Sequence, residues 1–174
     1  YGQKIVVKTW SRKAEKFYTY RDFEVFDESD NLLAIATTKW LLLNAKTKGI
    51  EKIAEDVIDR YESQDIPVFK DEAEVNKIAD PKVYDSCFSY NIQRKDIDIN
   101  DHMHNVYYLD LAYEALPDEV YKNCKFNNFE IMYKKEIKFG ESVKCFYSCI
   151  DDVHYITIKS EDEKTLHSIV KFSK

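Results

Sequence analysis

The sequence predicts an α+β protein in which antiparallel strands wrap around a buried helix, organised as two successive units. Aromatic residues make up 14% of the 174 residues, with 13 Tyr, and such side chains favour half-buried strands. Strand-like runs also outnumber helical ones. The segment 106–116 is apolar on almost every face and stops at Pro117, which indicates a helix in the interior of the fold. A sheet wrapped around this helix would bury it.

The first unit is expected to hold a three-stranded antiparallel sheet followed by a short helix. Runs rich in β-branched, aromatic and aliphatic residues predict strands at 3–10, 16–26 and 32–43. Residues 50–61 carry apolar side chains at helical spacing opposite a polar face, which predicts an amphipathic helix. Residues 71–81 are charged and lack aromatic side chains, which is typical of a linker.

The second unit is predicted to contain a strand, a polar loop, the buried helix and then four strands. The strands are predicted at 83–92, 129–138, 142–149, 154–160 and 165–172, and the loop at 94–105. We therefore place the two units at residues 1–63 and 83–174, with a linker at 64–82.

The two units resemble each other, because residues 139–147 align with residues 1–9 and both segments continue as strand, acidic turn and strand. A duplication would mean that the first unit lacks the strand and buried helix that precede Gly140 in the second. We therefore expect the first unit to be incomplete at its N-terminus, with a chance match as the alternative.

Composition excludes several classes of protein. With 44% hydrophobic residues, 3 Gly and 3 Pro, the chain can bury a core and is neither collagen-like nor of low complexity. No apolar run approaches the ~20 residues that span a bilayer. The net charge of −6 argues against a nucleic-acid partner bound through its phosphates. The sequence has no CxxC pair and no apolar signal segment, so we expect free thiols and a cytoplasmic location.

The polar loop concentrates the side chains best suited to chemistry. Six of them lie within nine positions: Asp96, Asp98, Asn100, Asp101, His102 and His104. If residues 98–102 are extended, Asp98, Asn100 and His102 share one face. A carboxylate, an amide and an imidazole would then be available for acid–base chemistry. The alternative is a turn rich in Asp and Asn that only caps the helix.

A metal site is the weaker interpretation of the same loop. His102 and His104 beside two carboxylates suit zinc or iron, but the sequence offers no third ligand at a clear spacing. We therefore expect no metal.

The remaining nucleophiles and imidazoles are expected to be structural. Cys87, Cys145 and Cys149 lie in predicted strands, where a buried, unreactive thiol is the common case. His154 and His167 are expected at the surface or at a sheet edge.

Glu136 follows Lys134 and Lys135 in the predicted strand 129–138. Such a run of charge is usually a solvated edge. A Glu136 that faced the helix would instead be placed to activate water, and composition leaves both readings open.

The loop, helix and strand together resemble the acyl-acyl-carrier-protein thioesterases, which are tandem double hot-dog proteins. Residues 96–108, DIDINDHMHNVYY, are similar to the family motif D-[IL]-D-x-N-x-H-x-N-N-x-x-Y, and residues 133–136, YKKE, to its Y-[RK]-[RK]-E strand. Thr38 and Trp40 are similar to the T-x-W region of the first hot-dog. The resemblance implies a tandem hot-dog fold whose first unit is incomplete here.

The resemblance also implies a site and a reaction. The family's catalytic residues fall on Asp98, Asn100, His102 and Glu136, and the reaction is hydrolysis of fatty acyl-carrier thioesters by an activated water, with no metal or organic cofactor. The residue after the family's Glu is often Cys in plant enzymes but is Ile137 here, which closes an acyl-cysteine route at that position. His104 stands where the family has the first Asn of its N-N pair. Backbone N–H groups near Asn105, at the start of the helix, are candidates to stabilise an oxyanion.

The partner implied is acyl carrier protein with its fatty acyl chain, with no nucleic acid and no membrane span. Because that carrier is acidic, the basic groups Arg12–Lys13 with Lys16, and Lys134–Lys135, are candidate docking residues. The protein is expected to be a pseudo-dimeric monomer or a homodimer. The alternative functions are a hot-dog hydratase or dehydratase and a non-catalytic acyl or acyl-carrier binding protein.

Overall fold

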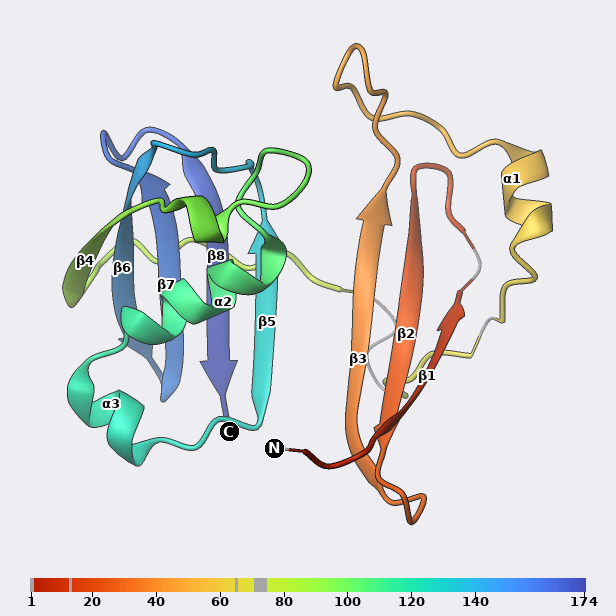
Figure 1. Cartoon of the computed structure of the whole chain (residues 1–174), viewed down its shortest axis with the longest axis horizontal. Coiled ribbons are helices and arrows are strands. Elements are labelled where there is room, and N and C mark those ends of the chain that lie inside the picture. Colours follow the sequence, from red (N-terminus) through yellow and green to blue (C-terminus); the bar gives the residue numbers. More distant parts are fainter. Residues whose placement is uncertain (1, 13, 65, 71–74) are drawn as a thin grey trace. The chain divides into compact units, whose positions relative to one another are not determined.

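The computed structural model describes residues 2–12, 14–64, 66–70 and 75–174. The chain divides into two compact units, residues 1–76 and 77–174, which are drawn from red to blue along the sequence in Figure 1. Each unit is described by itself. Among the described residues, no helix is long and apolar enough to cross a membrane.

The first unit contains an antiparallel sheet in the order β1-β2-β3. Its elements are β1 (Val6–Ser11), β2 (Tyr18–Phe26), β3 (Leu32–Leu41) and the helix α1 (Glu55–Arg60). The turn between β2 and β3 is closed by Asp27, whose Oδ1 accepts the N–H groups of Ser29 and Asn31 at 2.8 and 2.9 Å. This Asx geometry is why an acidic turn joins the two strands. The three predicted strands are confirmed.

Helix α1 is shorter than the helix predicted at 50–61. Ile50 pairs with Leu43 in an isolated β-bridge, and the N–H of Ile53 donates to the carbonyl of Lys16 at 3.0 Å. These contacts hold the first part of the segment in an extended form. Residues 50–61 therefore have helical spacing throughout, but only Glu55–Arg60 form a helix.

The two ends of the predicted linker are each bonded to a unit. In the first unit, Asp22 is fully buried and its Oδ2 accepts the N–H of Val68 at 2.9 Å. In the second unit, Asp80 forms an ion pair with Lys159 at 3.0 Å. Both anchors use a charged side chain to hold an otherwise irregular segment against a sheet.

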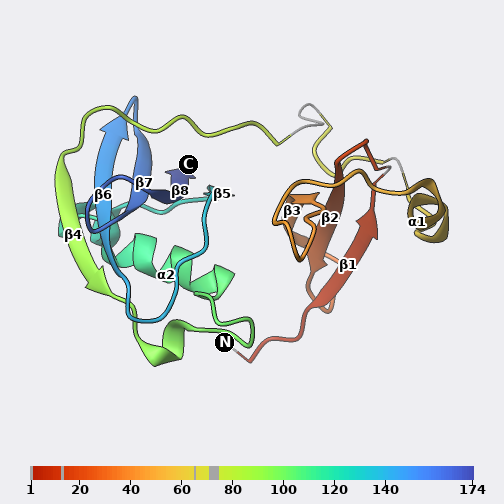
Figure 2. The same ribbon diagram turned by 90° about the horizontal axis from the view of Figure 1, so that it is seen from above.

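The second unit contains a five-stranded antiparallel sheet in the order β4-β6-β7-β8-β5. Its elements are β4 (Ser86–Asn91), the short 3-10 helix η1 (Arg94–Asp96), α2 (Asn105–Glu114), α3 (Asp118–Asn123), β5 (Asn128–Tyr133), β6 (Ser142–Ile150), β7 (Val153–Ser160) and β8 (Leu166–Ser173). Figure 2 shows the sheet curving around α2. The predicted succession of strand, polar loop, helix and four strands along the chain is confirmed, whereas α3 was not predicted and β5 stops five residues earlier than expected.

Helix α2 packs one face against the sheet. Tyr108, Leu111 and Ala112 are buried in the core that α2 shares with the sheet, while Val106 is 57% exposed and Asp110 is exposed. The expectation of burial on almost every face is therefore wrong for this helix. The sheet of this unit covers one side of α2 only, and the polar Asp110 lies on the other.

Candidate active site

The polar loop folds as a hairpin, which we call the polar hairpin (residues 96–104). The N–H of His104 donates to the carbonyl of Asp96 at 2.8 Å, which closes the base of the hairpin. Ile97 and Met103 pair across it in an antiparallel bridge. Met103 is 3% exposed, so the hairpin is fixed to the core by an apolar side chain.

The tip of the polar hairpin is a tight turn, so the extended conformation considered for residues 98–102 is not the one adopted. The N–H of Asp98 donates to the carbonyl of His102 at 2.8 Å, and the carboxylate of Asp98 accepts the N–H of Asn100 at 2.8 Å. Asp101 has φ +61°, a left-handed conformation that Asp tolerates better than most residues. The turn, rather than strand alternation, brings Asp98, Asn100 and His102 to one side.

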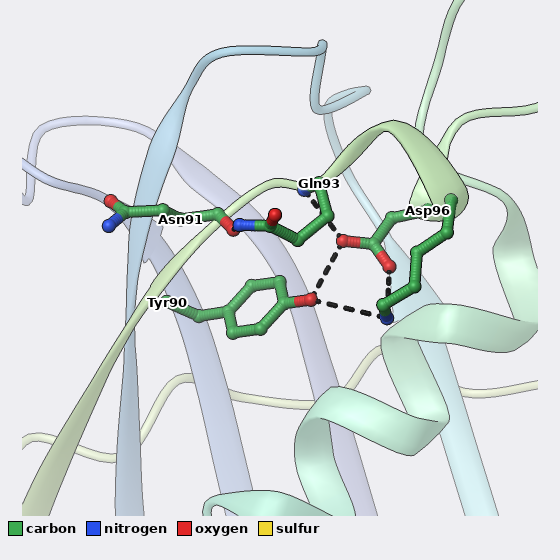
Figure 3. Close-up of polar contacts among 5 residues, drawn as sticks. Tyr90, Asn91, Gln93 and Asp96 are labelled. Atoms are coloured by element: carbon green, nitrogen blue, oxygen red, sulfur yellow. Dashed lines mark hydrogen bonds and ion pairs between the residues drawn. The ribbon is translucent and has the colours of Figure 1, made fainter.

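The buried carboxylate of Asp96 holds the base of the polar hairpin in place. It is 2% exposed, and its carboxylate accepts hydrogen bonds from the Tyr90 hydroxyl at 2.9 Å, the Gln93 N–H at 2.8 Å and the Lys95 ammonium at 2.8 Å. Figure 3 shows these contacts meeting at Asp96. Burial alone would raise the pKa of Asp96, but these hydrogen bonds outweigh it and lower the pKa below its ordinary value. The carboxylate is therefore ionised and fully engaged, and its role is structural.

The polar hairpin and the segment after β5 together line a pocket of about 430 Å³. The four residues that the family resemblance implied all lie in its wall. The lining residues are Asp98, Asn100, His102, Met103, His104, Asn105, Tyr108, Tyr133, Lys134, Lys135 and Glu136. His102 and Glu136, which are more than 30 positions apart in the sequence, thus line the same pocket.

The His102 and Glu136 side chains form a close polar contact in this pocket. His102 Nε2 lies 2.9 Å from Glu136 Oε2, with the two side chains 33% and 43% exposed. The second carboxylate oxygen, Oε1, lies 3.7 Å from the ammonium of Lys138. An imidazole and a carboxylate in hydrogen-bond contact, both reached by solvent, can take a proton from a water molecule and return it.

His104 caps helix α2. Its Nδ1 accepts the N–H of Val106 at 3.2 Å, which satisfies one of the free donors at the helix start. His Nδ1 and Asn Oδ1 occupy equivalent places along their side chains, so His104 can make here the capping bond that an Asn at this position would make. Val106 N–H is thereby occupied, and among the described residues Asn105 N–H has no hydrogen-bond acceptor, which leaves it as the candidate oxyanion donor.

Two tyrosines that were not predicted to belong to the site, Tyr108 and Tyr133, also line the pocket. Tyr108 is 3% exposed and packs edge-to-face on Tyr133 with ring centroids 5.2 Å apart. Burial raises the pKa of Tyr108 to about 12, so its hydroxyl is neutral. The Tyr133 hydroxyl donates to the carbonyl of Asn105 at 3.0 Å, which ties β5 to the start of α2.

The cysteines are only partly as expected. Cys145 is buried and its pKa is raised to about 12 by burial, so it carries no thiolate at neutral pH. Cys87 and Cys149 are exposed, which contradicts their predicted burial. Ile137, the residue after Glu136, is fully buried.

The expectation for the last two histidines is wrong. His154 and His167 are 8% and 4% exposed, because they lie on β7 and β8, which both have neighbouring strands on each side. His154 Nδ1 lies 2.9 Å from the Tyr147 hydroxyl, and His167 Nδ1 lies 3.1 Å from the carbonyl of Lys135. Within the described residues, no group of three or more His, Cys, Asp or Glu side chains is arranged to hold a metal ion.

In one of the two candidate docking groups, Arg12 does not fit a surface role. Arg12 is 9% exposed and its guanidinium lies 4.6 Å from the ring centroid of Tyr20, so it belongs to the interior of the first unit. Lys13 lies outside the described residues, and Lys16 is exposed. Lys134 and Lys135 are exposed and line the pocket itself.

Comparison with known proteins decides the family. The family model described as the acyl-ACP thioesterase C-terminal domain matches residues 79–173, and the N-terminal domain model matches residues 1–61. The chain belongs to the acyl-ACP thioesterase family. The resemblance stated from the two motifs is thereby confirmed.

Relatives in this family are similar at moderate identity. The chain is 26% identical over 149 residues to the oleoyl-acyl carrier protein thioesterase, chloroplastic, of Coriandrum sativum, a match that covers 80% of this chain and 40% of that protein. It is 28% identical over 141 residues to the palmitoyl-acyl carrier protein thioesterase, chloroplastic, of Cuphea hookeriana, covering 78% of this chain and 34% of that protein. The chain therefore spans less than half the length of these curated relatives.

Solved structures show the same fold. The 12:0-ACP thioesterase from Umbellularia californica superposes with a TM-score of 0.84 at 18% identity, covering 99% of this chain and 68% of that one. An acyl-ACP thioesterase from Bacteroides thetaiotaomicron gives 0.81 at 20% identity, covering 98% and 68%. The predicted hot-dog fold of class α+β is confirmed.

Proposed function

We propose that the protein hydrolyses fatty acyl-ACP to free fatty acid and ACP, a reaction that terminates fatty acid synthesis. The observation that carries the proposal is the 2.9 Å contact between His102 and Glu136 in a pocket of about 430 Å³. Membership of the acyl-ACP thioesterase family supports the choice of substrate.

The reaction proposed is direct attack by water. Glu136, hydrogen-bonded to His102, accepts a proton from a water molecule as the water oxygen bonds to the thioester carbonyl carbon. The resulting oxyanion collapses, the carbon–sulfur bond breaks, and the thiolate takes up the proton held by the pair. The products are one carboxylic acid and one thiol, and the scheme uses no metal ion, organic cofactor or acyl-enzyme.

Three further residues of the pocket are proposed to assist the attack by water: Asp98, Asn100 and Asn105. Hydrogen bonds lower the pKa of Asp98, first that from the Asn100 N–H and also that from the His102 N–H, so Asp98 is a carboxylate that fixes the turn beside His102. The Asn100 amide, in the pocket wall, positions the water or the substrate. The Asn105 N–H, at the start of α2, stabilises the oxyanion, where the helix dipole adds to the hydrogen bond.

Acyl carrier protein is the partner proposed. The chain itself has a net charge of −6, so an acidic carrier needs a local positive surface. Lys134 and Lys135 provide one at the pocket, where they would meet acidic side chains of the carrier beside its acyl-bearing arm. The oligomeric state proposed is a pseudo-dimeric monomer or a homodimer.

Thiol release from a panel of thioesters tests this function. The panel holds saturated acyl chains of increasing length on both ACP and CoA, together with a trans-2-enoyl thioester and a 3-hydroxyacyl thioester. We expect thiol release that is faster from ACP than from CoA. Hydration of the enoyl thioester without thiol release would favour the hydratase, and acyl-ACP binding without turnover would favour the non-catalytic binder.

A further inference from the structure

The segment that delivers Glu136 to the pocket departs from regular strand geometry at Lys134 and Lys135. The N–H groups of both residues donate to one carbonyl, that of His167 on β8, at 2.8 and 3.2 Å. The register before this point is regular, with Tyr133 opposite Ser168. Two residues opposite one, with both amides on a single acceptor, is the geometry of a β-bulge, which we call the Lys134–Lys135 bulge.

The bulge changes which face Glu136 occupies. Tyr133 faces α2, since its ring packs on Tyr108 and its hydroxyl bonds the Asn105 carbonyl. In a regular strand side chains alternate, so a residue three positions after Tyr133 would face away from α2. Glu136 nevertheless lines the same pocket as Tyr133 and meets His102. The extra residue directly after β5, where Lys134 and Lys135 both lie opposite His167, supplies the reversal.

The imidazole of His167 secures the bulge. Its Nδ1 lies 3.1 Å from the carbonyl of Lys135, and because a carbonyl only accepts, Nδ1 carries the hydrogen and donates it. The side chain is 4% exposed, so water competes poorly for this bond. His167 thus bonds both backbone polar groups of Lys135, the residue before Glu136. Its carbonyl accepts the Lys135 N–H, and its ring donates to the Lys135 carbonyl.

We propose that His167 is a positioning residue that acts through Glu136, by locking the Lys134–Lys135 bulge that aims the carboxylate at His102. This inference rests on the proposed hydrolysis. It assigns to a buried histidine on β8, which touches neither the substrate pocket nor the reacting atoms, control over the rate of water activation. Removing the ring bond leaves the Lys135 peptide less restrained and Glu136 displaced from its 2.9 Å contact.

The test uses variants of the full chain that separate the ring bond from bulk. His167→Leu removes the donor, His167→Asn keeps an amide N–H near the place of Nδ1, and His167→Gln places its amide near Nε2 instead. We expect His167→Leu to lower kcat roughly 10- to 100-fold with little change in KM, because misplacing a reacting group costs rate rather than affinity. His167→Asn should recover most of that loss and His167→Gln should not.

Two controls distinguish positioning from a general loss of stability. His154→Leu removes the other buried histidine, one strand away, and should not lower kcat in the folded protein. In a Glu136→Gln background, His167→Leu should cause no further loss of kcat, because the group it positions is already gone. Hydrogen exchange at the Lys134 and Lys135 amides should quicken in His167→Leu.

The inference and the proposed function fail differently. No thiol release from any thioester by the folded wild-type protein would overturn the proposed function, whereas full turnover by folded Glu136→Gln would overturn the role of Glu136 and this inference with it. A folded His167→Leu with wild-type kcat, beside an inactive Glu136→Gln, would overturn the positioning role alone, as would an undiminished His167→Leu effect in the Glu136→Gln background. If His167→Leu does not fold, equal kcat values for the Asn and Gln variants would overturn it.

Discussion

Replacing Asp96 with alanine should destabilise the second unit, because this carboxylate holds the base of the polar hairpin. Asp96 is 2% exposed and accepts hydrogen bonds from Tyr90, Gln93 and Lys95. Hydrogen bonds to a charged acceptor contribute about 1.5–3 kcal/mol each. The Lys95 ammonium is 71% exposed and contributes at most about 1 kcal/mol. Allowing for rehydration of the Tyr90 hydroxyl, we expect Asp96→Ala to lower the free energy of unfolding by about 3 kcal/mol.

The loss of stability in Asp96→Ala should be smaller at acid pH than at pH 7. The pKa of Asp96 is lower in the folded protein than its ordinary value of 3.8, so its stabilising contribution is present above the unfolded pKa and is lost as pH falls through the folded pKa. The stability difference between the wild-type protein and Asp96→Ala should therefore be full at pH 7 and shrink below about pH 4. Asp96→Asn keeps an oxygen acceptor and should lose only about 1 kcal/mol at pH 7.

Urea unfolding followed by tyrosine fluorescence and circular dichroism measures these differences. The comparison uses the wild-type protein, Asp96→Ala and Asp96→Asn at pH 7 and at acid pH, with the second unit's transition resolved from the first. A loss below about 1 kcal/mol for folded Asp96→Ala at pH 7 would contradict the anchoring role of Asp96, as would a difference that grows toward acid pH.

Three further predictions concern the cap and the charged residues. His104→Ala should cost about 1 kcal/mol in urea unfolding, since it removes the N-cap of α2, whereas His104→Asn should restore it; equal losses would contradict the capping role. Lys134→Glu and Lys135→Glu should each raise KM for acyl-ACP about 3- to 10-fold while leaving KM for a short acyl-CoA nearly unchanged, and equal effects on both substrates would argue against docking. Arg12→Glu should instead lower the free energy of unfolding by more than about 2 kcal/mol, because Arg12 is buried; an unchanged urea midpoint would contradict this.

The sheets could be predicted because their signals are local. Alternating apolar residues and acidic turns mark each strand, and the turn at Asp27 is closed by its own side chain. Pattern alone could not place α1, because tertiary contacts at Ile50 and Ile53 keep residues with helical spacing extended. The same limit applies to α2, whose exposed side depends on how far the sheet extends.

For the candidate site, the sequence identified residues but did not determine the local backbone geometry. Motif spacing identified residues that line the pocket, but it left open whether residues 98–102 form an extended segment or a turn. The Asp98 carboxylate closes a turn on Asn100. The placement of Glu136 beside His102 depends on one extra residue directly after β5, a feature that appears only when the carbonyl of His167 is seen to accept two amides. No periodicity in the sequence reveals such a bulge.

The measurement that tests the account most directly is kcat for thiol release from acyl-ACP by Glu136→Gln, beside the matched variant Glu130→Gln. Glu130 lies on β5, six residues before Glu136, and pairs with Lys171 outside the pocket, so each variant removes one carboxylate from the same stretch of chain. We predict that Glu136→Gln lowers kcat about 10²- to 10⁴-fold and that Glu130→Gln leaves it unchanged, with both proteins folded. Equal kcat values for the two folded variants would contradict the assignment of Glu136 to water activation.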